Sequence, residues 1–226
     1  MVLISPSTLA NTNVEPKTFI PPKAVHLLPV LKTVIEHSFP DFVLPQYFAG
    51  LVEQESCITL TGYSCWNDKA QLKTSREEGD GLGQLTKAYS SKGNVRFDSL
   101  TSMVKEHPSE LHELTWNNIL IRPDLQLSAI VLMTRDNYKR LYEVKDPIER
   151  VWFSDSAYNS GLKSVEDSRR LCSLIKGCNP QKWFNNVALT CTLSQKLIYG
   201  RTPCSINRTH VSNIANIRMN KYKRFF

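Results

Sequence analysis

Glu55 is the residue whose position first suggests chemistry in this sequence. In the stretch LVEQESC, a 3.6-residue period places Phe48, Leu51 and Glu55 on one helical stripe. Glu53 then points away from that stripe, as a solvated charge would. A carboxyl group facing an apolar interior has a raised pKa, which a general acid working near neutral pH needs. The alternative reading of Glu55 is a glutamate at the edge of the core, paired with a base.

Two further short motifs follow the Glu55-Ser56 pair along the chain. They are GLGQL at residues 81–85 and AYNSG at residues 157–161, and the chain closes with NRTHVSNIANIRMNKYKRF. In this order the motifs resemble those of the soluble lytic transglycosylases and goose-type lysozymes, whose pattern is ES, then GLMQ, then AYNxG, then a closing YVxxVxxRxxKY helix. The resemblance runs from about residue 22 to the end of the chain. Size and basic charge make the chain most similar to a bacteriophage endolysin of this family.

The resemblance implies cleavage of the β-1,4 bond between N-acetylmuramic acid and N-acetylglucosamine in peptidoglycan. Glu55 matches the catalytic residue, which protonates the leaving oxygen and then, as carboxylate, takes a proton from a hydroxyl group. In a lytic transglycosylase, a lyase, that hydroxyl is the muramyl O6 and the product is a 1,6-anhydro sugar. In a goose-type muramidase, a glycoside hydrolase, it belongs to water. We expect the transglycosylase and keep the muramidase as the alternative.

One acid suffices in this chemistry because the acetamido oxygen of the substrate attacks C1, in place of the second carboxylate that most glycosidases use. The motifs also imply four substrate-binding residues. Ser56 is expected to orient the acid and the acetamido group, and Gln84 to bind substrate near the acid. Tyr158 is expected to bond to Glu55 or the acetamido group, and Asn159 to bond to substrate. The alternatives are a helix hydroxyl bonded to a backbone carbonyl for Ser56 and a core aromatic for Tyr158.

The sequence departs from the family pattern in two places. Gly83 stands where a methionine is usual, which removes an apolar wall from the expected binding site. Gln84 follows Glu55 by 29 positions, a longer interval than the soluble transglycosylases use. Four acids in this interval are candidates for a second carboxylate that positions water, as the muramidase alternative requires, or for a solvated loop: Asp68, Glu77, Glu78 and Asp80.

Helices are expected to position these residues. Val25, Leu28, Leu31 and Ile35 mark a first amphipathic helix, and Pro45 suits the start of the helix that carries Glu55. The segment from Pro123 onward is apolar around nearly its whole circumference, as in a helix through the middle of a core.

Further helices are expected over residues 147–160, ending at Gly161, and over the last residues of the chain. We therefore predict a mainly α, lysozyme-like fold, with a small β-hairpin in a surface-exposed insertion at 58–83. Residues 1–22 are predicted to form an extended arm and residues 23–226 a single catalytic domain.

Composition and charge fit a globular protein with a polyanionic partner. Of the 226 residues, 41% are hydrophobic and 22% are charged, and the net charge is +7. No known nucleic-acid-binding pattern accompanies the basic residues, so nucleic acid is not expected as a partner. We expect a monomer that binds peptidoglycan glycan strands and anionic outer-membrane lipids. The most distant alternative is a non-catalytic basic protein that binds cell walls or nucleic acid.

The start of the chain lacks the features of a secretory signal peptide. The resemblance to endolysins then implies synthesis in the host cytoplasm and action on the wall from the periplasm after release, in bacteriolytic host cell lysis with antimicrobial effect. No cofactor is expected.

The six cysteines follow one another as if in three local pairs, without the spacing of a zinc site: Cys57, Cys65, Cys172, Cys178, Cys191 and Cys204. No metal is therefore expected. Local disulfides and buried free thiols are both compatible with this pattern, because the sequence does not fix the redox compartment.

Overall fold

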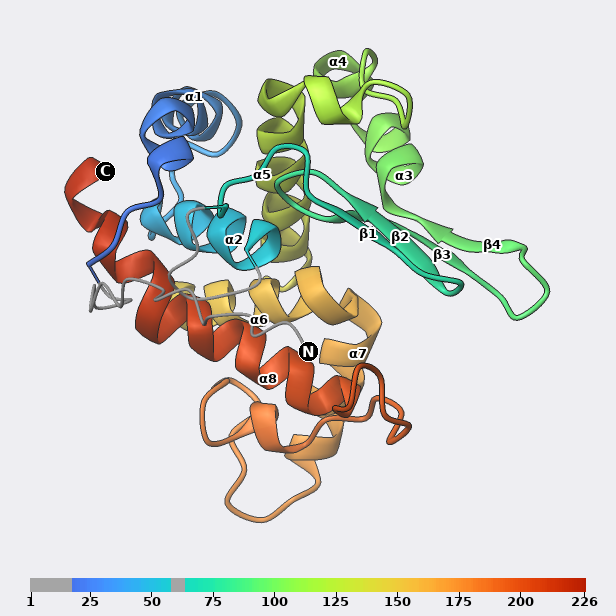
Figure 1. Cartoon of the computed structure of the whole chain (residues 1–226). Coiled ribbons are helices and arrows are strands. Elements are labelled where there is room, and N and C mark those ends of the chain that lie inside the picture. The colour runs from blue at the N-terminus through green and yellow to red at the C-terminus, as the bar shows by residue number, and fades with distance from the viewer. Residues whose placement is uncertain (1–17, 58–63) are drawn as a thin grey trace, which may run out of the picture.

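A computed structural model describes residues 18–57 and 64–226 of the chain. The fold is mainly helical with a small antiparallel sheet, consistent with the predicted lysozyme-like class (Figure 1). Its α-helices are α1 Pro22–Ser38, α2 Gln46–Ser56, α3 Ser99–Glu106, α4 Pro108–Leu111, α5 Pro123–Arg140, α6 Pro147–Ser160, α7 Leu162–Ser173 and α8 Pro203–Asn213. Shorter helical turns are η1 Ile119–Ile121, η2 Val187–Leu189, η3 Ile214–Arg218 and η4 Met219–Phe225.

Proline and short polar side chains define where many of the helices begin. Five helices, α1, α4, α5, α6 and α8, carry proline in their first turn, where the missing N–H costs nothing. The Asp146 carboxylate accepts from the first backbone N–H groups of α6, and the Thr202 hydroxyl does the same for α8. Gly161, with φ of 85°, ends α6 and allows α7 to follow at once. The predicted boundaries at Pro123, Pro147 and Gly161 are confirmed.

The sheet is larger than the predicted hairpin. Its strands β1 Gln71–Lys73, β2 Glu77–Asp80, β3 Leu85–Tyr89 and β4 Val95–Asp98 pair in sequence order, all antiparallel. The expected hairpin is β1–β2, and two further strands lie beyond its predicted end at residue 83. The insertion is not wholly exposed either, because Cys65 and Trp66 are buried in the core. Its residues 58–63 lie outside the described part of the chain.

Helix α2 lies at the centre of the helical part (Figure 1). Its residues Tyr47 to Val52 are fully buried, and Gly50 packs so closely on the C-terminal helix that an added Cβ would lie 2.9 Å from Met219 Cβ. The expectation that Glu53 is solvated is wrong. Its side chain is fully buried, with Oε1 accepting from Arg218 at 2.9 Å and from Lys221 at 2.7 Å. An α-helix surrounded by partners has no solvent face on which a charge can sit.

Helix α5 connects two hydrophobic clusters in the described part of the chain. Its Leu127 and Ile130 belong to the main core with α1, α2 and α6, whereas Ala129 and Leu132 pack against β3, α3 and α4. The prediction of an apolar circumference is therefore confirmed. In the first helix, Leu28, Leu31 and Ile35 are buried as predicted, but Val25 is exposed and Ala24 takes its place in the core.

The closing helix contains a π-helical turn at Ile214–Arg218. The family's closing pattern has two residues between its second valine and its arginine, whereas this chain has three between Ile214 and Arg218. A π-turn accommodates one residue more than an α-turn. The turn thus keeps Arg218, Lys221 and Tyr222 directed at the buried Glu53.

The cysteines pair in the three local disulfides Cys57–Cys65, Cys172–Cys178 and Cys191–Cys204. The Cys57–Cys65 disulfide begins directly after α2 and ties the insertion to the end of the helix that carries Glu55. In the described ranges, none of the helices combines the length and apolar character that crossing a bilayer demands.

Candidate active site

A groove lies between the sheet with α3 on one side and α5, α6 and the start of α7 on the other. Its volume is about 760 Å³, and it is lined by Glu55, Gln84, Tyr158 and Asn159 among others. Ser99, Ser102 and Met103 of α3 and Phe97 of β4 form the opposite wall. A second, polar pocket of about 330 Å³ also contains Glu55 and Asn159 and is bounded by α8. Glu55 therefore lies where the two spaces meet.

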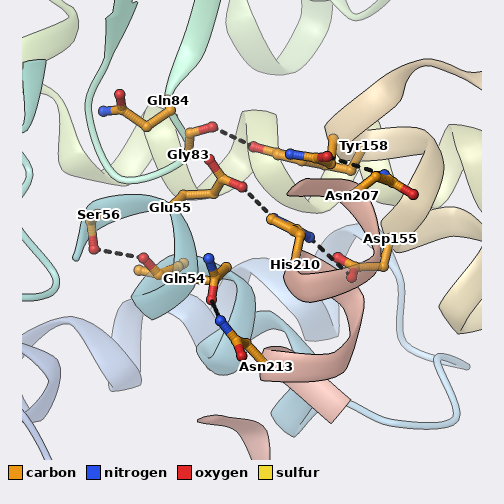
Figure 2. Close-up of polar contacts among 12 residues, drawn as sticks. Gln54, Glu55, Ser56, Gly83, Gln84, Asp155, Tyr158, Asn207, His210 and Asn213 are labelled. Atoms are coloured by element: carbon orange, nitrogen blue, oxygen red, sulfur yellow. Dashed lines mark hydrogen bonds and ion pairs between the residues drawn. The ribbon is translucent and has the colours of Figure 1, made fainter. Parts of the chain in front are cut away.

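Glu55 is in the last turn of α2, and its side chain retains 15% exposure. Its Oε1 lies 2.5 Å from Nε2 of His210 on α8 (Figure 2). The alternative reading, a glutamate paired with a base, is therefore observed, and the carboxyl group also lines a groove. Its role as the catalytic acid stays a prediction. The carboxyl group is held from behind by His210 while its front faces the groove.

His210 is fixed on its other side by a buried acid. Its Nδ1 lies 3.2 Å from Asp155 Oδ2, and Tyr47 donates from its hydroxyl to Asp155 Oδ1 at 2.8 Å. Burial disfavours the imidazolium, but Asp155 and Glu55 outweigh it and raise the pKa of His210 to about 10. The histidine is therefore a cation at neutral pH, with both ring nitrogens donating to carboxyl oxygens.

Tyr158 points across the groove floor to the loop before β3. Its hydroxyl donates to the Gly83 carbonyl at 2.8 Å (Figure 2). Of the two predicted contacts of Tyr158, the hydrogen bond to Glu55 is therefore not observed. Burial, followed by the charges of Glu55 and Asp155, raises its pKa well above the ordinary value, so the phenol keeps its proton.

Gly83 does not leave an apolar wall missing. A Cβ at this position would lie 2.5 Å from Ile130 Cγ1 and 2.6 Å from the Tyr158 hydroxyl. The space that a side chain would need is occupied by a residue of α5 and by the tyrosine. The expectation of a gap is wrong, because another element fills it.

Asn159 borders both spaces, as expected for a substrate-binding amide. Its Oδ1 accepts from Asn207 Nδ2 at 3.1 Å, and Asn207 is itself fixed by Ser156 on the same helix. This contact sets the orientation of the Asn159 amide, whose nitrogen is then available to donate to a ligand.

Gln84 lines the groove, but its side chain is turned toward its own loop (Figure 2). Nε2 donates to the Gly81 carbonyl at 3.1 Å and to the Ala70 carbonyl at 3.3 Å. Its backbone has φ of 46°, in the left-handed region. The residue thus shapes the loop, and its predicted bond to substrate stays a prediction.

Ser56 makes the contact given above as its alternative. Its hydroxyl donates to the Val52 carbonyl at 2.6 Å and accepts from the Trp66 backbone N–H at 2.8 Å. It is buried and lines neither of the two spaces that contain Glu55. The serine joins the end of α2 to the insertion.

The four acids of the insertion lie in different surroundings. Asp68 pairs with Lys23 at 3.0 Å, Glu78 with Lys87 at 3.5 Å, and Asp80 accepts from Gln71 at 3.1 Å. Glu77 alone of the four lines the groove with Glu55, and its Oε1 accepts from the Tyr199 hydroxyl at 2.9 Å.

One group in the described part of the chain has the donor atoms for a cation: Glu106, His107 and Asp136. Arg135 lies against the same group, with a guanidinium nitrogen 3.4 Å from His107 Nδ1 and another 3.6 Å from Asp136. A fixed positive charge at this place disfavours a metal ion.

The contacts behind Glu55 are the part of the site that the motifs missed. His210 takes the place of the first tyrosine in the family's closing pattern, and Asp155 lies one turn before Tyr158. Both residues had a signal in the sequence. His210 is a substitution within a motif, and Asp155 is an acid among apolar residues. Tyr47 had no signal, since tyrosine is common in helix cores.

No family model matches the chain. A segment of 78 residues is 36% identical to membrane-bound lytic murein transglycosylase F of Pseudomonas fluorescens strain Pf-5, covering 34% of this chain and 16% of that protein. The same protein of P. fluorescens strain Pf0-1 is 36% identical over 77 residues, covering 33% and 15%. That of Stutzerimonas stutzeri strain A1501 is also 36% identical over 77 residues. A third of this chain is thus similar in sequence to lytic murein transglycosylases.

Proposed function

We propose that this protein is a lytic transglycosylase that degrades peptidoglycan, cleaving the β-1,4 bond between N-acetylmuramic acid and N-acetylglucosamine with formation of a 1,6-anhydro product. The observation that carries the proposal is the position of Glu55, whose carboxyl group opens on a groove large enough for sugar rings. The partial similarity to lytic murein transglycosylases supports the same reaction.

The proposed reaction has two steps. Glu55 first donates a proton to the glycosidic oxygen as the bond to C1 breaks, while the acetamido oxygen of the same sugar attacks C1. The muramyl O6 then displaces the acetamido oxygen from C1, and its proton goes to the Glu55 carboxylate. The acid is regenerated, and no second enzymic carboxylate takes part. Tyr158 and Asn159, on the groove wall beside Glu55, are proposed to bind the acetamido group and the neighbouring ring.

Glu55→Gln tests the assignment. The amide keeps the size of the side chain and cannot donate an acid proton, so we expect clearing of permeabilised Gram-negative cells to fall by about a hundredfold or more. The activities of wild-type and variant protein should also be compared on purified peptidoglycan. Circular dichroism should first establish that both samples contain the same concentration of folded protein. Equal clearing by both would refute the proposed role of Glu55.

Mass spectrometry of the released muropeptides separates the lyase from the muramidase. An anhydro product is lighter by one water than a reducing product. The second candidate, a goose-type muramidase, is favoured by one observation, the presence of the Glu77 carboxylate in the groove. A product with a reducing end would select that alternative.

The setting in which the protein acts belongs to the same proposal. We propose an endolysin-like role in which the net charge of +7 holds the enzyme on anionic walls and outer-membrane lipids. Binding to walls should then weaken with added salt. Wild-type protein that leaves walls intact but binds DNA in a salt-sensitive way would instead favour a non-catalytic binding protein.

A further inference from the structure

The proposed reaction uses Glu55 and the groove but leaves the side chains behind Glu55 without a role. His210, Asp155 and Tyr47 come from α8, α6 and α2, and they form one connected chain of polar contacts that ends on the Glu55 carboxyl. Figure 2 shows the part of this chain that runs from Asp155 through His210 to Glu55. Asp155 and Tyr47 are fully buried, and the His210 side chain is 5% exposed. Buried polar groups are costly unless they are paired, so a completely paired set leading to one carboxyl group calls for an explanation.

The contacts divide the two oxygens of Glu55 between two tasks. Oε1 lies 2.5 Å from His210 Nε2. The ring cannot turn, because Nδ1 is bonded to Asp155 Oδ2 and the other oxygen of Asp155 accepts from the Tyr47 hydroxyl. In the part of the chain that the structure describes, Oε2 has no such partner, and we assign it to the ligand.

We propose that His210, oriented by Asp155 and Tyr47, is the positioning residue of Glu55, holding Oε1 and stabilising the carboxylate that forms when Oε2 gives up its proton. This role rests on the proposed glycosidic cleavage. In the first step the proton on Oε2 passes to the glycosidic oxygen, and Glu55 becomes a carboxylate beside the imidazolium. In the second step Oε2 takes the O6 proton, and His210 keeps both of its protons throughout.

A tyrosine at this place, as in the family's closing pattern, donates a hydrogen bond without a charge. The histidine adds a positive charge at the same point, so ionised Glu55 is favoured more strongly here. Replacing the histidine with a neutral donor should therefore move the alkaline limb of the pH–rate profile upward.

Within residues 18–57 and 64–226, few charged or titratable groups surround His210. Glu55 faces it from α2 and Asp155 from α6, with Tyr158 of α6 close enough to both acids to feel their charges. Arg201 and Arg218 share the small polar pocket with His210. Since guanidinium groups in proteins stay protonated, we assign the pH response of the site to the acid and the histidine.

His210→Gln and His210→Tyr test the proposal. Both replace the cation with a neutral donor, and we expect kcat on soluble glycan strands to fall about tenfold, with KM changed less than about twofold. The alkaline limb of the pH–rate profile should move up by about 1 pH unit in both variants. His112→Gln is the control, since His112 also lies near a carboxylate, that of Glu113 at 4.0 Å, and neither residue lines the groove. Its profile should coincide with that of the wild type.

A second measurement does not depend on activity. In ¹⁵N-histidine-labelled wild-type protein at pH 8, both ring nitrogens of His210 should carry protons, and Asp155→Asn should leave the ring neutral. A neutral His210 ring in the wild type at pH 8 would overturn the proposal, and so would an unshifted pH–rate profile in active His210 variants. A wild type inactive on glycan strands but with a protonated His210 would instead count against the proposed function.

Discussion

Helix α2 carries two glutamates, Glu53 and Glu55, and they have opposite environments. Glu53 is fully buried and bonded to Arg218, Lys221 and Tyr222, all from the closing helix. Glu55 meets a single histidine at its back and a groove at its front. The first carboxylate is surrounded by two cations, and the second is paired with one group and left open on the other side.

The comparison shows what separates a structural carboxylate from one that can do chemistry. Arg218 and Lys221 enclose the Glu53 carboxyl group in the interior, and a carboxyl group without access to a ligand cannot pass a proton to one. Among the described residues, none makes a hydrogen bond or ion pair to Oε2 of Glu55, and the carboxyl group lines the groove. Burial alone would have selected Glu53 as the acid, so access and partner type are the better criteria.

The largest expected difference between the two sites is seen by replacing each acid with glutamine. Glu53→Gln removes the anion between two buried cations, and we expect the free energy of unfolding to fall by about 3–5 kcal/mol. Glu55→Gln should change stability by less than about 1 kcal/mol, since its side chain is partly solvated and keeps a polar partner. Urea denaturation followed by circular dichroism measures both.

The activities should show the reverse order. Glu53→Gln protein that remains folded should clear cell walls at close to the wild-type rate, whereas Glu55→Gln should not. The exposed Glu36→Gln on α1 serves as a control for both measurements. A Glu53→Gln protein that is as stable as wild type would contradict the structural role given to Glu53.

The sites should also differ in how stability depends on pH. His210 has a folded-state pKa of about 10, above the ordinary 6.5, so its stabilisation is complete below pH 6.5 and is lost as the pH rises to 10. The difference in unfolding free energy between wild type and His210→Gln should therefore shrink by a few kcal/mol between pH 6.5 and pH 10. Arg218 keeps its charge over this range, so Arg218→Gln should cost nearly the same at both pH values. A constant difference for His210→Gln would contradict the raised pKa.

The sequence predicted the elements with strong local signals and missed what depends on packing around them. Pro123 and Pro147 begin helices where proline suits the first turn, and Gly161 ends one. The helical stripe placed Glu55 on the inner side, and the motifs brought Tyr158 and Asn159 to the same groove.

The environment of Glu53 was predicted wrongly because a helical period identifies one apolar face of α2. It does not reveal that the closing helix covers another face of α2 and contacts Glu53 there. The contact between Glu55 and His210 joins residues 155 positions apart, which no local pattern reveals. The π-turn that directs Arg218 depends on a one-residue insertion, visible only against a family pattern.

Gly83→Ala tests the wall that joins the sheet to Tyr158. The added Cβ would lie within 3 Å of Ile130 and of the Tyr158 hydroxyl, so we expect a loss of about 1–3 kcal/mol in stability. Displacement of the hydroxyl should lower kcat about tenfold while Glu55 stays in place. Adding Ile130→Ala to Gly83→Ala makes room for the methyl group. The loss of unfolding free energy caused by Gly83→Ala should be smaller when Ile130→Ala is present. If the losses caused by the two substitutions simply add, the loop relaxes in another direction.

The smallest expected effect concerns Glu77, the acid of the insertion that shares the groove with Glu55. If the acetamido oxygen replaces a second carboxylate, Glu77→Gln should change kcat less than about threefold and leave the anhydro product unchanged. Tyr199→Phe is the matched variant, because it removes the hydroxyl that donates to Glu77 at 2.9 Å and leaves the carboxylate free. Muropeptide mass spectrometry on both variants gives the ratio of anhydro to reducing ends. Two results together would make Glu77 the acid that positions water. Tyr199→Phe would raise the share of reducing ends, and Glu77→Gln would lose more than about a hundredfold in activity. The reaction would then be hydrolysis, with Glu55 and Glu77 sharing the work that the proposed transglycosylase reaction assigns to Glu55 alone.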